Sequence, residues 1–108
     1  MDRLEEARRL EVPTKLGTFV FVAPYKKQRL AAEGYTRQLT LGQTVDPQTE
    51  AEARALAYCE TLCVETPKDF NWNTFDDDEL LVELYTKLVE HDRTFREKFS
   101  GTGPTMGA

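Results

Sequence analysis

The chain has 108 residues, with 14 lysines and arginines against 19 aspartates and glutamates and a formal net charge of −5. With 40% hydrophobic and 31% charged residues, its composition is that of a globular protein and not of a disordered chain. No apolar run approaches the roughly 20 residues of a membrane span, and the start, MDRLEEARRL, lacks the apolar stretch of a signal peptide. We therefore expect a cytoplasmic protein with no membrane partner and one small domain over residues 1–99.

The charge is unevenly distributed along the sequence. Residues 1–38 hold 8 basic and 5 acidic residues, whereas residues 39–108 hold 6 and 14, so the two parts carry +3 and −8. Nucleic acid repels so acidic a part, and we expect no nucleic-acid partner. The uneven charge suits either a solvated surface or self-association through oppositely charged parts.

The first third of the chain predicts one short helix and at least one strand. Residues 1–10 place apolar side chains at helical spacing, and Pro13 limits that helix. β-branched and aromatic residues predict a strand over residues 17–22. A strand needs a partner, and we expect it at residues 37–44, where leucines alternate with polar residues.

The rest of the chain predicts helices. Pro24 precedes a helix over residues 25–33, which Gly34 stops or kinks. Asp46 and Pro47 form a strong start for a helix over residues 47–64.

The best-defined element is a long amphipathic helix over residues 74–99 with an acidic first turn. The spacing of Thr74 and Asp77 predicts that the two side chains cap its start reciprocally. Residues 100–108 predict a flexible tail. The predicted fold is therefore mainly α, a small helical domain of three to four helices with a short strand or β-hairpin near residues 17–44.

No arrangement of polar residues predicts catalysis, a cofactor or a metal site. Cys59, Cys63 and His91 leave a zinc site one ligand short, and two cysteines on one face of a helix suit free thiols better than a disulfide. Residues 69–80 match a calcium loop in part, but Thr74 stands where that loop needs glycine and Leu80 where it needs glutamate.

Aromatic and apolar side chains are better candidates for function because they serve as anchors in protein interfaces. Several lie in the predicted strand and loops, and others extend the last helix beyond what a small domain needs, although core packing explains many such residues. The candidates for partner binding are Phe19, Phe21, Tyr25, Phe70, Trp72, Leu88, Phe95 and Phe99.

Residues 13–99 resemble the tail assembly chaperones of long-tailed bacteriophages. Three segments carry the resemblance: PYKKQRLAAEGYTRQL, AEARALAYCETLCVETPKDF and, after Trp72, DDDELLVELYTKLVEHDRTFREKF. The resemblance implies a non-enzymatic protein of the bacterial host cytoplasm that binds the tape-measure protein while the tail tube protein assembles along it. We also expect the chain to associate with itself.

Two other functions remain open from the sequence. One is a structural virion component, such as a head-tail connector, in which residues 18–22 pair with a neighbouring subunit. The other is a small regulatory module that uses the basic segment from Lys26 to Arg37 on nucleic acid.

Overall fold

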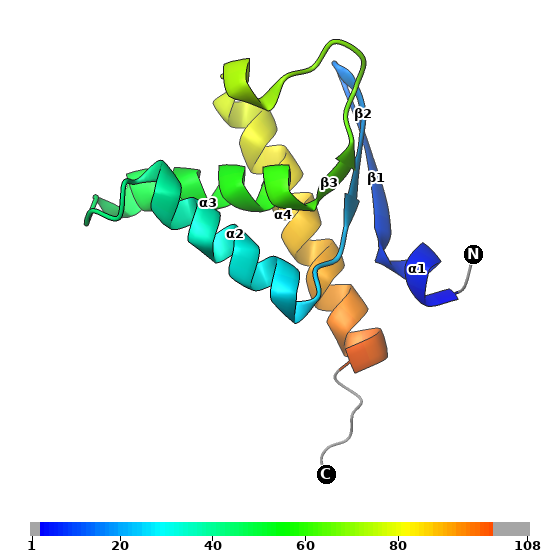
Figure 1. Cartoon of the computed structure of the whole chain (residues 1–108). Coiled ribbons are helices and arrows are strands. Elements are labelled where there is room, and N and C mark those ends of the chain that lie inside the picture. Colours follow the sequence, from blue (N-terminus) through cyan, green and yellow to red (C-terminus); the bar gives the residue numbers. More distant parts are fainter. Residues whose placement is uncertain (1–2, 101–108) are drawn as a thin grey trace.

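A computed structural model describes residues 3–100 (Figure 1). Three main helices and a three-stranded antiparallel sheet confirm the predicted, mainly helical fold. In chain order the elements are α1 (Arg3–Arg8), β1 (Arg9–Thr14), β2 (Gly17–Val22), α2 (Lys26–Leu39), α3 (Pro47–Leu62), β3 (Cys63–Glu65), the 3₁₀ turn η1 (Trp72–Thr74), α4 (Asp78–Phe95) and the π-helical turn η2 (Arg96–Ser100).

The sheet has the order β1-β2-β3, with β2 in the centre. The hairpin of β1 and β2 closes where Thr14 pairs with Gly17, which adopts a φ of 124° that side chains disfavour. On the other side of β2, Phe21 pairs with Cys63, and the register shifts next to it. The predicted strand at residues 17–22 is thus confirmed.

The predicted partner strand at residues 37–44 is wrong. Its first residues end α2, and the partners of β2 are β1 and β3. The pairing with β1 needs only a tight turn, and Pro13 is tolerated because β1 is an edge strand. The predicted helix over residues 1–10 is correspondingly too long, since α1 ends at Arg8.

The α2 helix is longer than predicted because Gly34 does not stop it. Gly34 is exposed within the helix, where glycine costs only about 1 kcal/mol relative to alanine. The chain instead leaves the helix at Leu41 and Gly42, which have φ values of 57° and 70°. The α2–α3 connection therefore begins later than the sequence indicates.

The predicted start is correct for α3 and wrong for α4. Asp46 caps α3 by accepting from the amide of Thr49, so the predicted start is confirmed. In α4 the cap is Asp77 alone, which accepts from the amide of Leu80 at 3.0 Å. Thr74 lies in η1 and donates to the carbonyl of Asn71, so the reciprocal cap is wrong and α4 begins at Asp78.

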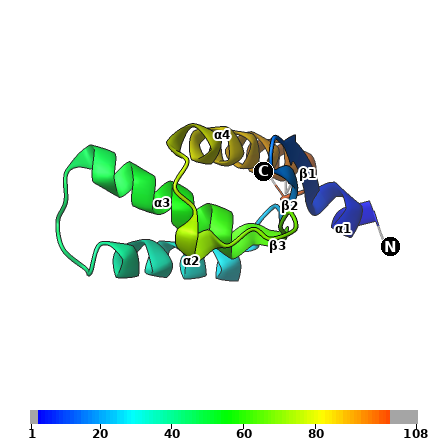
Figure 2. The ribbon, with the colours of Figure 1, turned by 90° about the horizontal axis from the view of Figure 1, so that it is seen from above.

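The core lies where the inner face of α4 meets β2 and α3. Phe19 and Phe21 of β2 are fully buried, as are Cys59 of α3 and Leu84 of α4. Figures 1 and 2 show α2 and α3 side by side as a hairpin that projects away from the sheet, with α4 crossing α3. Most of the expected C-terminal tail, residues 101–108, lies outside the described residues.

Candidate interaction surfaces

Half of the residues predicted to bind a partner lie in the core of the structure. Phe19 and Phe21 are 0% exposed, Leu88 is 2% exposed and Phe95 is 7% exposed. Their burial supplies much of the hydrophobic stabilisation of the fold. In this conformation their side chains are out of reach of a partner.

The other four predicted residues are partly accessible. Phe70 and Trp72 are half-buried and pack edge to face, with ring centroids 4.8 Å apart, in a cluster that covers Phe19. Tyr25 is exposed, and the guanidinium of Arg8 lies 3.8 Å from its ring centroid. Phe99 is half-buried, 5.1 Å from the ring of Phe95. The structure therefore does not bring the eight residues together on one surface.

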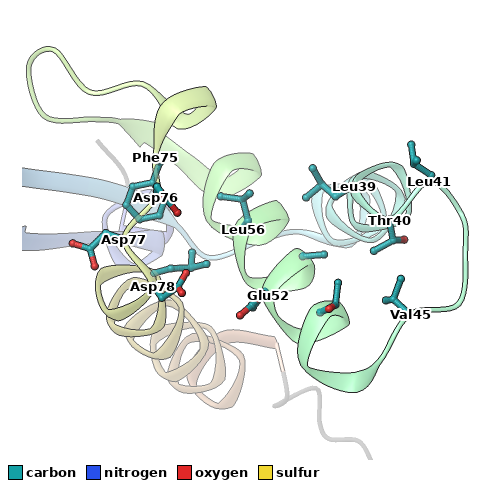
Figure 3. A pocket seen from close by; sticks show the side chains of 13 residues that line it. Leu39, Thr40, Leu41, Val45, Glu52, Leu56, Phe75, Asp76, Asp77 and Asp78 are labelled. Carbon is teal, nitrogen blue, oxygen red and sulfur yellow. The ribbon is translucent and has the colours of Figure 1, made fainter.

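A groove lies between the end of α2 and the start of α4, with α3 between them (Figure 3). It has a volume of about 480 Å³. Leu39 faces it from the end of α2, Leu41 lies at its edge in the following turn, and Phe75 lies on the other side. Its larger apolar lining residues are Leu39, Leu41, Val45, Leu56, Phe75 and Leu81.

The rim of this groove is acidic. Glu52, Asp76, Asp77 and Asp78 line it, and no lysine or arginine does. Lys15 pairs with Asp77 at 2.9 Å, and the hydrogen bond from Lys15 is the main cause that lowers the pKa of the Asp77 carboxyl. Glu52, Asp76 and Asp78 take part in none of the ion pairs of residues 3–100. We call this feature the acidic groove.

A second apolar surface runs along the outer face of α4. Val82 is 63% exposed and Val89 is 46% exposed, with half-buried Tyr85 between them. The spacing of three, four and seven residues puts the three side chains on one stripe of the helix. Three exposed glutamates border this α4 stripe: Glu79, Glu83 and Glu90.

The outward face of α2 has the opposite charge. Lys26, Lys27 and Arg37 are exposed there, together with Leu30, which is 61% exposed. With 3.6 residues per turn they fall within an arc of roughly 100°. None of the three cations belongs to an ion pair of the described residues. We call this surface the basic face.

A polar cluster holds α2 against α3. The carboxylate of Glu33 accepts from the guanidinium of Arg54 at 2.9 Å and from the hydroxyl of Tyr58 at 2.7 Å. Hydrogen bonds from Arg54 and Tyr58 lower the pKa of Glu33, whereas burial, followed by the bond to Glu33, raises the pKa of Tyr58 to about 12. This cluster orients the acidic groove and the basic face relative to each other.

The cysteines and the histidine lie in separate surroundings. Cys59 is buried in α3, Cys63 begins β3 instead of continuing the helix, and both thiols are free. His91 lies on α4 with Nε2 2.9 Å from the carbonyl oxygen of Arg8. Within residues 3–100, no three His, Cys, Asp or Glu side chains are placed to hold a metal ion.

The same part of the chain has no helix whose length and hydropathy would let it cross a bilayer.

Sequence reasoning missed Leu30, Leu41, Val82 and Val89 as exposed side chains. Val82 and Val89 stand seven residues apart on the polar side of the α4 pattern, a signal that was available but weaker than the leucine stripe. Exposure of Leu41 depends on how the α2–α3 hairpin projects, which local patterns do not specify.

Comparison with protein-family models, curated proteins and solved structures finds no match for this chain.

Proposed function

We propose that the chain is a non-enzymatic assembly chaperone of long-tailed phage tails. In this role it binds the tape-measure protein in the cytoplasm of the bacterial host while the tail tube protein assembles. The resemblance over residues 13–99 gives the proposal its specific partners.

The observation that carries the proposal is the α4 stripe of Val82, Tyr85 and Val89. Exposed apolar side chains at helical spacing suit contact with an amphipathic helix, which presents its own apolar positions at the same spacing. Both valines are exposed although the opposite face of the same helix fills the core. An apolar stripe kept in water on a rigid helix is typical of a protein-binding surface.

Charge supports the same function. The glutamates that border the stripe and the net charge of −5 would keep a complex with a hydrophobic client in solution. They also favour clients whose apolar face is flanked by lysine or arginine.

Co-expression with a helical segment of a candidate tape-measure protein tests the proposal. We expect the wild-type chain to keep the segment soluble and to co-purify with it. The double variant Val82→Asp, Val89→Asp should lose both effects because it places charges in the apolar contact. Leu16→Asp is the matched control, since Leu16 is 48% exposed in the β1–β2 turn and is not part of the α4 stripe.

Two results would contradict the proposal, one its function and the other its binding surface. If the wild-type chain leaves the segment insoluble and unbound, the chaperone function is wrong. If the double variant solubilises the segment as well as the wild type does, the function stands but α4 is not its surface. Phe95→Asp is unsuitable for this test because Phe95 is in the core and its replacement would unfold the chain.

A further inference from the structure

The acidic groove and the basic face are complementary surfaces on one chain. The groove combines apolar side chains with Glu52, Asp76 and Asp78, which no cation neutralises within residues 3–100. The basic face combines Lys26 and Lys27 with one exposed leucine. Apolar contact and opposite charge therefore match between the two surfaces.

The two surfaces cannot meet within one molecule. Leu39 lines the acidic groove from α2, and Figure 3 shows its side chain directed toward the groove. At 100° per residue, Leu39 lies roughly 180° around α2 from Leu30. The basic face thus points away from the groove of its own chain, and an occupant with these features must come from another molecule.

The basic face also has the shape that helix docking needs. Ala31 and Gly34 are exposed beside Leu30, so the backbone of α2 can approach a neighbour closely. A Cβ added at Gly34 would meet no atom within 4 Å, which leaves room on that side of the helix. Leu30 is placed to enter the apolar lining while Lys26 and Lys27 reach the acidic rim.

We infer that the chain associates head to tail, the basic face of α2 in one copy docking in the acidic groove of a second copy. The two contacting surfaces differ, so a pair of copies leaves one groove and one basic face free. The association does not depend on the proposed client and can extend into rings or rows of copies.

Sedimentation equilibrium and light scattering on the full chain test this inference with two charge-reversed variants. Lys26→Glu, Lys27→Glu alters the basic face, and Asp76→Lys, Asp78→Lys alters the groove. We expect each variant alone to associate at least about tenfold more weakly than the wild type, because like charges then face each other. Added salt should also weaken the wild-type association, since the charges are exposed.

Mixing the two variants tests whether the basic face and the acidic groove contact each other. The Lys26, Lys27 variant keeps its groove and the Asp76, Asp78 variant keeps its basic face, so the mixture retains one native contact. The reversed face of the first variant and the reversed groove of the second also carry opposite charges, so we expect the mixture to recover the association that each variant alone has lost. Combining all four substitutions in one chain restores opposite charges and should restore self-association.

The control variant is Lys87→Glu, a charge reversal on an exposed side chain of α4 outside both surfaces. Circular dichroism establishes that each variant remains folded, and Leu30→Asn replaces any variant that does not. A wild-type chain that stays monomeric, association that survives both variants, or a mixture that recovers no association would overturn the inference. Binding of the basic face to DNA in place of a second copy would overturn it as well.

Discussion

The imidazole Nε2 of His91 lies 2.9 Å from the backbone carbonyl oxygen of Arg8, which joins α4 to the α1–β1 junction. The ring carries its proton on Nε2 when it donates this bond. The amide of Ala23 donates to the same oxygen at 2.8 Å, and the Arg8 guanidinium donates to the carbonyl of Ala23 at 3.0 Å. Arg8 therefore ties together the first helix, the end of β2 and the last helix.

Replacing Arg8 should destabilise the chain far more than replacing the next residue. Arg8 is 6% exposed and also donates to the Gln28 side chain at 2.9 Å. Arg8→Met therefore removes several hydrogen bonds made by a buried guanidinium. We expect a loss of about 2 kcal/mol in the free energy of unfolding, measured by urea titration. Arg9→Met, which removes only surface ion pairs, should cost less than about 0.5 kcal/mol. Equal losses would contradict the role assigned to Arg8.

Two glycine-to-alanine substitutions should have opposite effects. Gly17 has a φ of 124°, and a Cβ there would lie 2.9 Å from the Cβ of Pro67. Gly17→Ala should therefore destabilise the chain by about 1–3 kcal/mol. Gly34→Ala, in an exposed helix interior with open space, should stabilise it by about 0.5–1 kcal/mol. Thermal unfolding followed by circular dichroism measures both, and a stabilising Gly17→Ala would show that the turn differs from the structure described.

Protonation of Glu33 at acidic pH should lower the stability of the α2–α3 hairpin. Its pKa is lower in the folded chain than in the unfolded chain, where glutamate titrates near pH 4.3. The stabilisation is therefore fully present above about pH 4.3 and is lost as the pH falls through the folded-state pKa. We expect the difference in unfolding free energy between wild type and Glu33→Gln to shrink below about pH 4. The control Glu90→Gln, on an exposed side chain of α4, should show no such trend.

The two cysteines should react with thiol reagents at different rates. Burial raises the pKa of the Cys59 thiol to about 12 and that of the Cys63 thiol to about 11. Cys59 is 0% exposed whereas Cys63 is partly accessible, so alkylation at pH 8 should reach Cys63 first. In urea both should react quickly. Mass spectrometry of the labelled peptides measures the order, and faster labelling of native Cys59 would contradict its burial.

The sequence by itself determined the elements whose signals are local. The start of α3 follows from Asp46 and Pro47, and β2 follows from its β-branched and aromatic residues, because caps and strand patterns act over a few neighbours. The amphipathic pattern of α4 likewise predicted its inner face. The mainly helical fold class followed from these elements.

Only the tertiary structure decided which strands pair and which apolar residues stay in water. β2 pairs with β1 and β3 and not with residues 37–44, because the short loop to β1 costs little entropy and α2, which extends through Gly34, takes up the first residues of that segment. Phe19 and Phe95 enter the core while Leu41 and Val82 remain exposed, since burial depends on how the α2–α3 hairpin and α4 cross. The acidic groove exists only through that crossing, because its residues come from segments far apart in the chain, whereas the basic face lies on α2 alone.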